Sequence, residues 1–178
     1  GEGTPILFVH EFAGDYRSWE HQIEFFSKKY KTITYNARGF PPSQVPKDVN
    51  SYSQDIALED LINVIKELSI TPCHVVGLSM GGFAALYLGM KNPELARSIV
   101  VAGCGYGSVI EQQENFRKEA LEVARRFRSE DMEDFGRVYT AGPTRVQLER
   151  KNLTEYKKFV NYFLEHSSEG CALTMEGL

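Results

Sequence analysis

A serine framed by glycines constrains the fold of this chain more than any other sequence feature. Gly77-Leu78-Ser79-Met80-Gly81 separates a run of strand-forming residues, 73–76, from a small-residue helical pattern over 82–88. A G-x-S-x-G segment in this setting is typical of a sharp strand-to-helix turn that presents the serine hydroxyl at the carboxyl edge of a sheet. Gly77 and Gly81 allow the strand and the helix to approach closely enough for the turn. The sequence therefore predicts a Ser79 with a strained backbone that presents its hydroxyl at such an edge.

Strand and helix patterns alternate through the first 107 residues. The strand-like runs cover 6–9, 30–35, 73–76 and 98–101, and the helical patterns between them cover 15–29, 53–68 and 80–92. This order implies right-handed crossovers and a parallel sheet with helices on both faces, so we expect an α/β fold over residues 1–107.

The character of the chain changes after residue 107. Residues 108–166 read as successive helices with an aromatic-rich apolar stripe, and Gly142-Pro143 marks a break between two of them. Such stripes at helical spacing more often form the core of a helical region than a ligand pocket. We expect residues 108–178 to form a separate helical region.

Composition narrows the classes of partner. With 178 residues, 42% of them hydrophobic, the chain can bury one substantial core. A formal charge of −4 argues against nucleic acid or an anionic membrane as the main partner. Cys73, Cys104 and Cys171 are widely spaced and odd in number, which disfavours disulfides and a metal site and favours reduced thiols in a cytoplasmic protein. No apolar run approaches the length of about 20 residues that a membrane span needs.

Two further segments, each directly after a predicted strand, extend the pattern. His10-Glu11-Phe12-Ala13-Gly14 follows the first strand, and Asn36-Ala37-Arg38-Gly39-Phe40-Pro41-Pro42-Ser43 follows the second. Together with the turn at Ser79, they make the chain resemble an α/β-hydrolase of the esterase, haloperoxidase and C–C hydrolase branch. The resemblance implies an α/β-hydrolase-like parallel sheet core over 1–107 and a helical cap or lid over 108–178. Glu11 departs from the family's usual glycine, as Asn36 and Pro42 depart from its Asp and Gly.

The resemblance also implies roles for particular residues. Ser79 is the expected nucleophile, and the backbone N–H groups of Met80 and Phe12 are the expected donors to an oxyanion. His10 precedes the oxyanion segment, and we expect it to support that loop rather than act as the base.

A general base is missing from the expected positions. In this family the triad acid and then the histidine follow the serine, and the histidine lies beyond the last strand. The segment 98–108 contains no Asp, we expect His166 to lie on a helix, and we expect Asp131 and Asp134 to cap a helix. We therefore expect the triad acid and histidine to lie outside this chain. An N-terminal hairpin also has no counterpart, so the chain is interpreted as an incomplete fragment of the fold.

Three functional hypotheses follow. The leading one is serine hydrolysis of a small ester or related carbonyl compound through an acyl-enzyme, with no cofactor and no metal. A C–C bond hydrolase or a cofactor-free perhydrolase of the same fold is the second. The third is a non-catalytic protein that lacks the base and binds a ligand or a partner; because an open sheet edge recruits strands, it could form a homodimer or pair with a companion chain.

Overall fold

A four-stranded parallel sheet forms the centre of the protein, in the order β2-β1-β3-β4. The computed structural model describes residues 1–177. The strands are β1 (Pro5–Val9), β2 (Lys31–Thr34), β3 (Cys73–Leu78) and β4 (Ala96–Ala102). In the register of the central pair, Leu7 lies opposite Val75 and Val9 opposite Gly77. The predicted parallel α/β architecture is confirmed.

Eight α-helices and three short 3-10 helices connect or follow the strands within residues 1–177. The α-helices are α1 (Glu20–Phe26), α2 (Gln54–Glu67), α3 (Met80–Lys91), α4 (Ile110–Ser129), α5 (Met132–Thr140), α6 (Val146–Lys151), α7 (Leu153–Leu164) and α8 (Ser168–Glu176). The 3-10 helices are η1 (Tyr16–Trp19), η2 (Val49–Ser51) and η3 (Pro93–Leu95).

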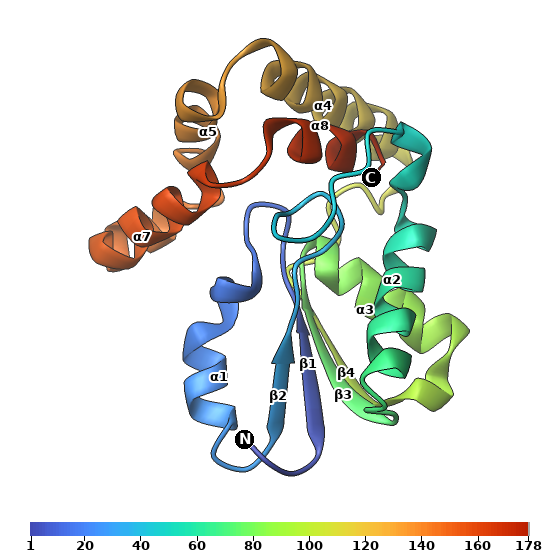
Figure 1. Ribbon diagram of the computed structural model, residues 1–178. Helices are drawn as coiled ribbons and strands as arrows, with labels where there is room; N and C mark the ends of the chain where they lie inside the picture. The colour runs from blue at the N-terminus through green and yellow to red at the C-terminus, as the bar shows by residue number, and fades with distance from the viewer. Residues whose placement is uncertain (178) are drawn as a thin grey trace.

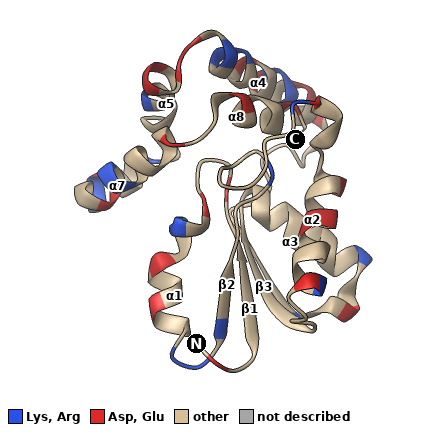
Figure 2. Ribbon diagram, viewed as in Figure 1, with Lys and Arg blue, Asp and Glu red and all other residues tan. Residues whose placement is uncertain are grey.

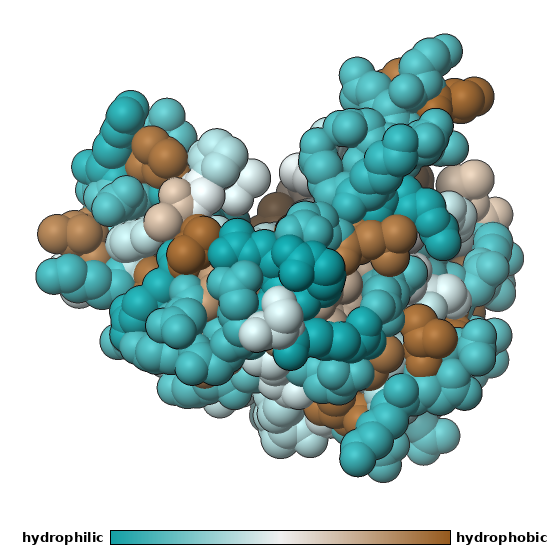
Figure 3. Space-filling view, turned by 90° about the horizontal axis from the view of Figure 1, so that it is seen from above, coloured by the Kyte–Doolittle hydropathy of each residue, from teal (hydrophilic) through white to brown (hydrophobic). Residues whose placement is uncertain are grey.

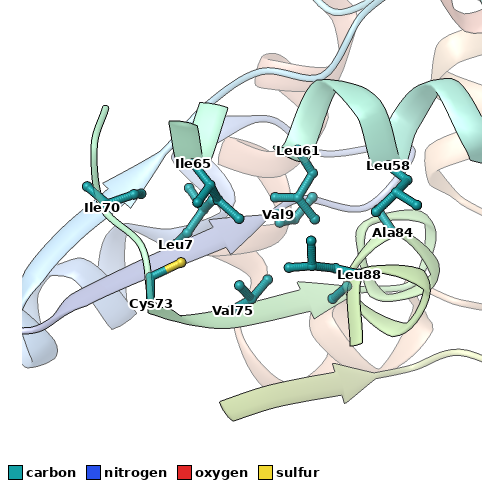
Figure 4. Close-up of a cluster of buried hydrophobic side chains, with 11 residues drawn as sticks. Leu7, Val9, Leu58, Leu61, Ile65, Ile70, Cys73, Val75, Ala84 and Leu88 are labelled. Atoms are coloured by element: carbon teal, nitrogen blue, oxygen red, sulfur yellow. The ribbon is translucent and has the colours of Figure 1, made fainter. Parts of the chain in front are cut away.

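Helices cover both faces of the sheet because alternate strand residues point to opposite sides. On one face, Leu7 and Val75 pack with Leu61 and Ile65 of α2 and Leu88 of α3, all of them fully buried. Figure 4 shows these side chains converging between β1, β3 and the two helices. On the other face, the smaller cluster lies beneath η1 and α1 and contains Ile6, Phe8 and Trp19. Burial of each such Leu or Ile side chain contributes about 1.5–3 kcal/mol.

Helices α4 to α8 form a second layer, here called the helical layer, at the carboxyl end of the strands. Figure 1 shows α4, α5, α7 and α8 above the tips of the arrows, with α1 beside the sheet on one side and α2 and α3 on the other. Helix α4 packs along α8, and α5 and α6 pack against α7. The sequence predicted successive helices after residue 107, and the structure has only α-helices after β4 within the described residues. The division into two domains stays a prediction.

Capping residues fix several helix boundaries that the sequence predicted. The Ser53 hydroxyl accepts a hydrogen bond from Ile56 N at 3.2 Å, which starts α2. The Asp131 carboxylate accepts from Asp134 N at 2.7 Å, so Asp131 caps α5 as predicted.

Two sequence-based expectations about secondary structure were wrong. The pattern over 15–29 is not one helix: Asp15 caps η1, and α1 starts only at Glu20 and ends at Phe26. His166 does not lie on a helix, because α7 ends at Leu164 and the Ser167 side chain caps α8, so His166 lies in the turn between them.

Candidate active site

Ser79 occupies a strained turn between β3 and α3. Its backbone has φ 51° and ψ −115°, a left-handed conformation that costs a non-glycine residue about 1–3 kcal/mol. A hydrogen bond from Ser79 N to Ala102 O, 2.8 Å long, ties this turn to the end of β4. The surrounding sheet therefore holds Ser79 in the conformation that the motif predicted.

The two framing glycines are required by close backbone contacts. A Cβ atom at Gly77 would lie 2.1 Å from Gly81 O, and one at Gly81 would lie 2.3 Å from Val9 O. Carbon atoms never approach backbone oxygen so closely without displacement, so strand β1, strand β3 and helix α3 meet at this point only because both residues lack side chains.

The first turn of α3 offers an unpaired donor beside the serine. Met80 is the first residue of the helix, where an N–H group has no acceptor within the helix. Within residues 1–177, Met80 N donates no backbone or side-chain hydrogen bond. The positive end of the helix dipole adds to the attraction for negative charge at this position.

His10 fixes the orientation of the loop that follows β1. Its ring is fully buried, and its Nδ1 lies 2.7 Å from Glu11 O while its Nε2 accepts a hydrogen bond from Ala37 N at 2.9 Å. Because Nε2 accepts, Nδ1 carries the hydrogen and donates it to the Glu11 carbonyl. Burial lowers the pKa of His10, which favours this neutral form.

The same bonds orient the Phe12 N–H group. Glu11 O also accepts a hydrogen bond from Gly14 N at 3.0 Å. In a trans peptide the carbonyl and the following N–H point in opposite directions, so two donors on Glu11 O turn Phe12 N–H away from His10. Within the described residues, Phe12 N makes no hydrogen bond.

Side chains of the two candidate donor residues extend into the helical layer. Phe12 and Met80 belong to one hydrophobic cluster with Phe127 of α4, Phe163 of α7 and Tyr139 of α5. The ring of Phe12 lies 6.2 Å from that of Phe127 and 5.6 Å from that of Tyr139, measured between centroids. Seen from above in Figure 3, the surface of this side is hollowed, with hydrophobic residues at the bottom of the hollow.

Asn36 stabilises the loop after β2 by hydrogen bonds. Its Oδ1 accepts from Tyr16 N at 2.8 Å, and its Nδ2 donates to Pro41 O at 2.6 Å. The Ser43 hydroxyl donates to Asn36 O at 2.6 Å. Asn36, which stands where the family usually has Asp, therefore joins the loop after β2 to the first residue of η1.

None of the four histidines is hydrogen-bonded to Ser79. His10 is hydrogen-bonded to Glu11 O and Ala37 N, and His21 is exposed on α1. His74 Nδ1 lies 2.7 Å from Ser98 Oγ, and His166 Nε2 faces Asp15. In the part of the chain that the structure describes, the Ser79 hydroxyl has no side-chain hydrogen-bond partner. The sequence prediction that the acid and base lie elsewhere stays a prediction.

A buried Asp15–His166 pair is the site feature that sequence analysis missed. His166 Nε2 lies 3.4 Å from Asp15 Oδ2, and both side chains are at most 3% exposed. Burial raises the pKa of Asp15, but hydrogen bonds from His166 and Arg17 outweigh it and lower this pKa well below its usual range. The two residues are 151 positions apart, and no local pattern joins them.

The Cys104 thiol lies beside the turn and donates a hydrogen bond to the Ser79 carbonyl. Cys104 Sγ lies 3.0 Å from Ser79 O, and a Cβ at Gly82 would lie 2.3 Å from this sulfur. Burial raises the pKa of the Cys104 thiol and of the Cys171 thiol.

Residues 1–177 contain no cluster of three or more His, Cys, Asp or Glu side chains arranged to hold a metal ion. None of the helices in these residues is long and apolar enough to cross a membrane.

Comparisons with known proteins agree on one family. The family model described as alpha/beta hydrolase fold matches residues 4–166. Among curated relatives, epoxide hydrolase 3 of Mus musculus is 31% identical over 112 residues, which are 63% of this chain and 30% of that protein. The 3-oxoadipate enol-lactonase 1 of Acinetobacter baylyi is 32% identical over 123 residues, 68% of this chain and 45% of that protein.

A solved structure shows the same likeness. A thermophilic esterase from Thermogutta terrifontis superimposes with a TM-score of 0.82 at 25% sequence identity, covering 99% of this chain and 64% of that one. The chain thus spans less than half the length of the two curated relatives named above.

Proposed function

Because the chain belongs to the α/β-hydrolase family, we propose that it supplies the nucleophile and oxyanion hole of a serine hydrolase that acts on a small ester or related carbonyl compound. Relatives named as an enol-lactonase and an esterase favour this substrate class. The proposed reaction proceeds through an acyl-enzyme on Ser79 and uses no cofactor.

One observation carries the proposal: Ser79 has a strained backbone, and two backbone N–H groups, that of Met80 directly after it and that of Phe12 in the loop after β1, have no partner within the described residues. Met80 N–H is at the start of α3, and Phe12 N–H is turned away from His10 by the bonds on Glu11 O. Two preorganised donors beside a presented hydroxyl are what acyl transfer requires, because negative charge develops on the carbonyl oxygen during attack.

The chemistry follows from this arrangement. Ser79 Oγ attacks the carbonyl carbon, its proton passes to a general base, and the carbonyl oxygen becomes an oxyanion that accepts hydrogen bonds from Met80 N and Phe12 N. Collapse of the tetrahedral intermediate releases the alcohol, which takes the proton from the base. Water then attacks the acyl-enzyme by the same route and frees the acid and Ser79.

The base and the acid that orients it are proposed to come from outside these 178 residues. This proposal is compatible with the alignments, which cover 30% and 45% of the length of the two curated relatives. His166 is a poor candidate for the base because its Nε2 faces Asp15 and aromatic rings surround it.

The helical layer is proposed to act as the cap that shapes the acyl pocket. Phe12, whose N–H is one of the proposed oxyanion donors, packs its ring against those of Phe127 and Tyr139 in this layer. We propose that apolar side chains of this layer favour substrates whose acyl part is apolar.

Hydrolysis of 4-nitrophenyl acetate and butyrate tests the proposal. Ser79→Ala should reduce kcat/KM by about a thousandfold or more, because the acyl-enzyme can no longer form. Ser129→Ala, an exposed serine at the end of α4, is the matched control and should leave the rate unchanged. Retention of activity in Ser79→Ala, with a native circular dichroism spectrum, would remove Ser79 as the nucleophile.

A non-catalytic role is the second candidate, favoured by the absence of a side-chain partner for the Ser79 hydroxyl within the described residues. Under that alternative, the wild-type protein at the length at which its cells make it hydrolyses neither ester above the rate of Ser79→Ala. The same assay therefore separates the two candidates.

A further inference from the structure

The carbonyl of Ser79 accepts two hydrogen bonds, one from the backbone and one from a side chain. Phe83 N donates to it at 3.1 Å, which is the first backbone bond of helix α3, and Cys104 Sγ lies 3.0 Å from the same oxygen. Ser79 O and Met80 N belong to one peptide group, which is trans. In a trans peptide the C=O and the following N–H point in opposite directions. The two donors on Ser79 O therefore fix the direction of Met80 N–H.

The peptide group of the second proposed donor is held in the same way. Glu11 O accepts one backbone bond, from Gly14 N at 3.0 Å, and one side-chain bond, from His10 Nδ1 at 2.7 Å. Phe12 N–H lies on the opposite side of that peptide group. The two peptide groups that are proposed to bind the oxyanion thus share one feature: the carbonyl of each accepts a backbone bond and a side-chain bond.

The Cys104 thiol is in a state that donates. Its side chain is half-buried, and burial raises the pKa of the thiol above its ordinary value, so the sulfur carries its hydrogen at neutral pH. Another acceptor, Ala102 O, lies 3.7 Å from Sγ, farther than Ser79 O. The hydrogen of the thiol is therefore directed to the carbonyl of Ser79.

The backbone around the sulfur fixes its position. Gly103 and Gly105 flank Cys104 with φ of 60° and 131°, conformations that residues with side chains rarely adopt. A Cβ at Gly82 would lie 2.3 Å from Sγ, so the sulfur packs directly on the backbone of the first turn of α3. The contact between the thiol and Ser79 O therefore depends on the absence of a side chain at Gly82.

The elements that meet at the turn supply no charged side chain beside this weak donor. Residues 73–90, which include β3 and all of α3 except Lys91, contain no Lys, Arg, Asp or Glu, and neither do residues 98–110. Figure 2 draws β3 in the colour of uncharged residues along its length. A thiol donates weakly, and a charged group on β3, on α3 or in the loop after β4 would compete with it. The sequence of these elements leaves the bond to Ser79 O without such a competitor.

From these contacts we propose that Cys104 is a positioning residue of the oxyanion hole: its thiol donates to Ser79 O and thereby holds Met80 N–H in the direction of the developing oxyanion, as His10 does for Phe12 N–H. The inference rests on the proposed function, because Met80 N–H has this role only if Ser79 is acylated. A group that orients an oxyanion donor acts in the transition state, where charge develops on the carbonyl oxygen. Loss of the thiol should therefore lower kcat and leave KM nearly unchanged.

Steady-state hydrolysis of 4-nitrophenyl butyrate, by the protein at the length at which its cells make it, tests the proposal. Cys104→Ala should lower kcat about fivefold and change KM by less than about twofold, because the S–H···O bond is lost. Cys104→Ser keeps a hydroxyl donor at this position and should hold kcat within about twofold of the wild type. Cys73→Ala is the matched control: its thiol is fully buried in the core beside β1 and α2, so its loss should lower stability in urea unfolding and leave kcat unchanged.

A second variant reaches the same hydrogen bond from α3. Gly82→Ala should displace the sulfur and lower kcat about fivefold, and the double variant with Cys104→Ala should be no slower than Cys104→Ala alone, because the methyl group takes the space of the sulfur.

Three results would overturn the proposal while wild-type activity persists. These are an unchanged kcat in Cys104→Ala or, where that variant does not fold, in Gly82→Ala; an equal loss of kcat in Cys104→Ser and Cys104→Ala; and a loss in Cys73→Ala as large as in Cys104→Ala. A wild-type rate no higher than that of Ser79→Ala would refute the proposed function, and this inference with it.

Discussion

Replacement of His10 by leucine tests how the loop after β1 is held. The ring of His10 is fully buried and links two loops by one donated and one accepted hydrogen bond. Leucine has a similar volume but neither donates nor accepts, so His10→Leu removes both bonds with little change in packing.

The expected loss of stability can be worked out bond by bond. Glu11 O keeps its hydrogen bond from Gly14 N, so loss of the His10 bond there costs about 1 kcal/mol. Ala37 N loses its acceptor in a half-buried position, which costs about 1–3 kcal/mol. The free energy of unfolding should therefore fall by about 2–4 kcal/mol at pH 7.5.

The pH dependence gives this prediction a second, independent readout. Burial lowers the pKa of His10 below its ordinary value of 6.5, so the unfolded chain binds a proton that the folded chain does not. The contribution of His10 is therefore present above pH 6.5 and is lost as the pH falls below that value. The deficit of His10→Leu should shrink on moving from pH 7.5 to pH 5.5.

Urea unfolding followed by tryptophan fluorescence measures both effects. His21→Leu, at an exposed position of α1, is the matched control and should unfold close to the wild type at both pH values. The rate of ester hydrolysis should also drop by about tenfold or more in His10→Leu, because Phe12 N–H is no longer fixed. A His10→Leu protein as stable as the wild type at pH 7.5 would refute the reasoning.

Three further predictions concern packing, charge and assembly. Gly81→Ala should destabilise the fold by about 3 kcal/mol in urea unfolding, because the new Cβ would lie 2.3 Å from Val9 O; a loss below 1 kcal/mol would contradict this. Asp15→Asn should lower stability by about 2 kcal/mol at pH 7, and because the folded pKa of Asp15 is depressed by His166 and Arg17, the difference should narrow in thermal melts as the pH falls below 3.8. The outer edge of β4 has no paired strand within residues 1–177, and we propose that it pairs with a second copy of this chain or with a companion chain; a monodisperse monomer by light scattering would contradict the homodimer.

The parallel core was predictable because its signals are local. Strand-like runs predicted all four strands, and the glycines around Ser79 predicted a turn that only residues without side chains permit. The boundary of α1 was not predictable in the same way, because Asp15 caps a 3-10 turn that interrupts an otherwise continuous helical pattern.

The buried Asp15–His166 pair could not be predicted from the sequence because its two residues are 151 positions apart in the chain. Glu11 and His166 line one cavity, yet nothing in the sequence near either residue indicates the other. One weak signal was Glu11 itself, an acidic residue between His10 and the apolar Phe12 and Ala13, but only the fold reveals whether its side chain faces solvent or the interior.

The central claim is that Ser79 is an activated nucleophile, and mass spectrometry after fluorophosphonate treatment tests it most directly. The protein would be taken at the length at which its cells make it, labelled, digested and mapped. The account predicts one adduct, on the peptide that contains Ser79, and none in Ser79→Ala. An unmodified wild-type protein, or an adduct on another serine, would contradict it.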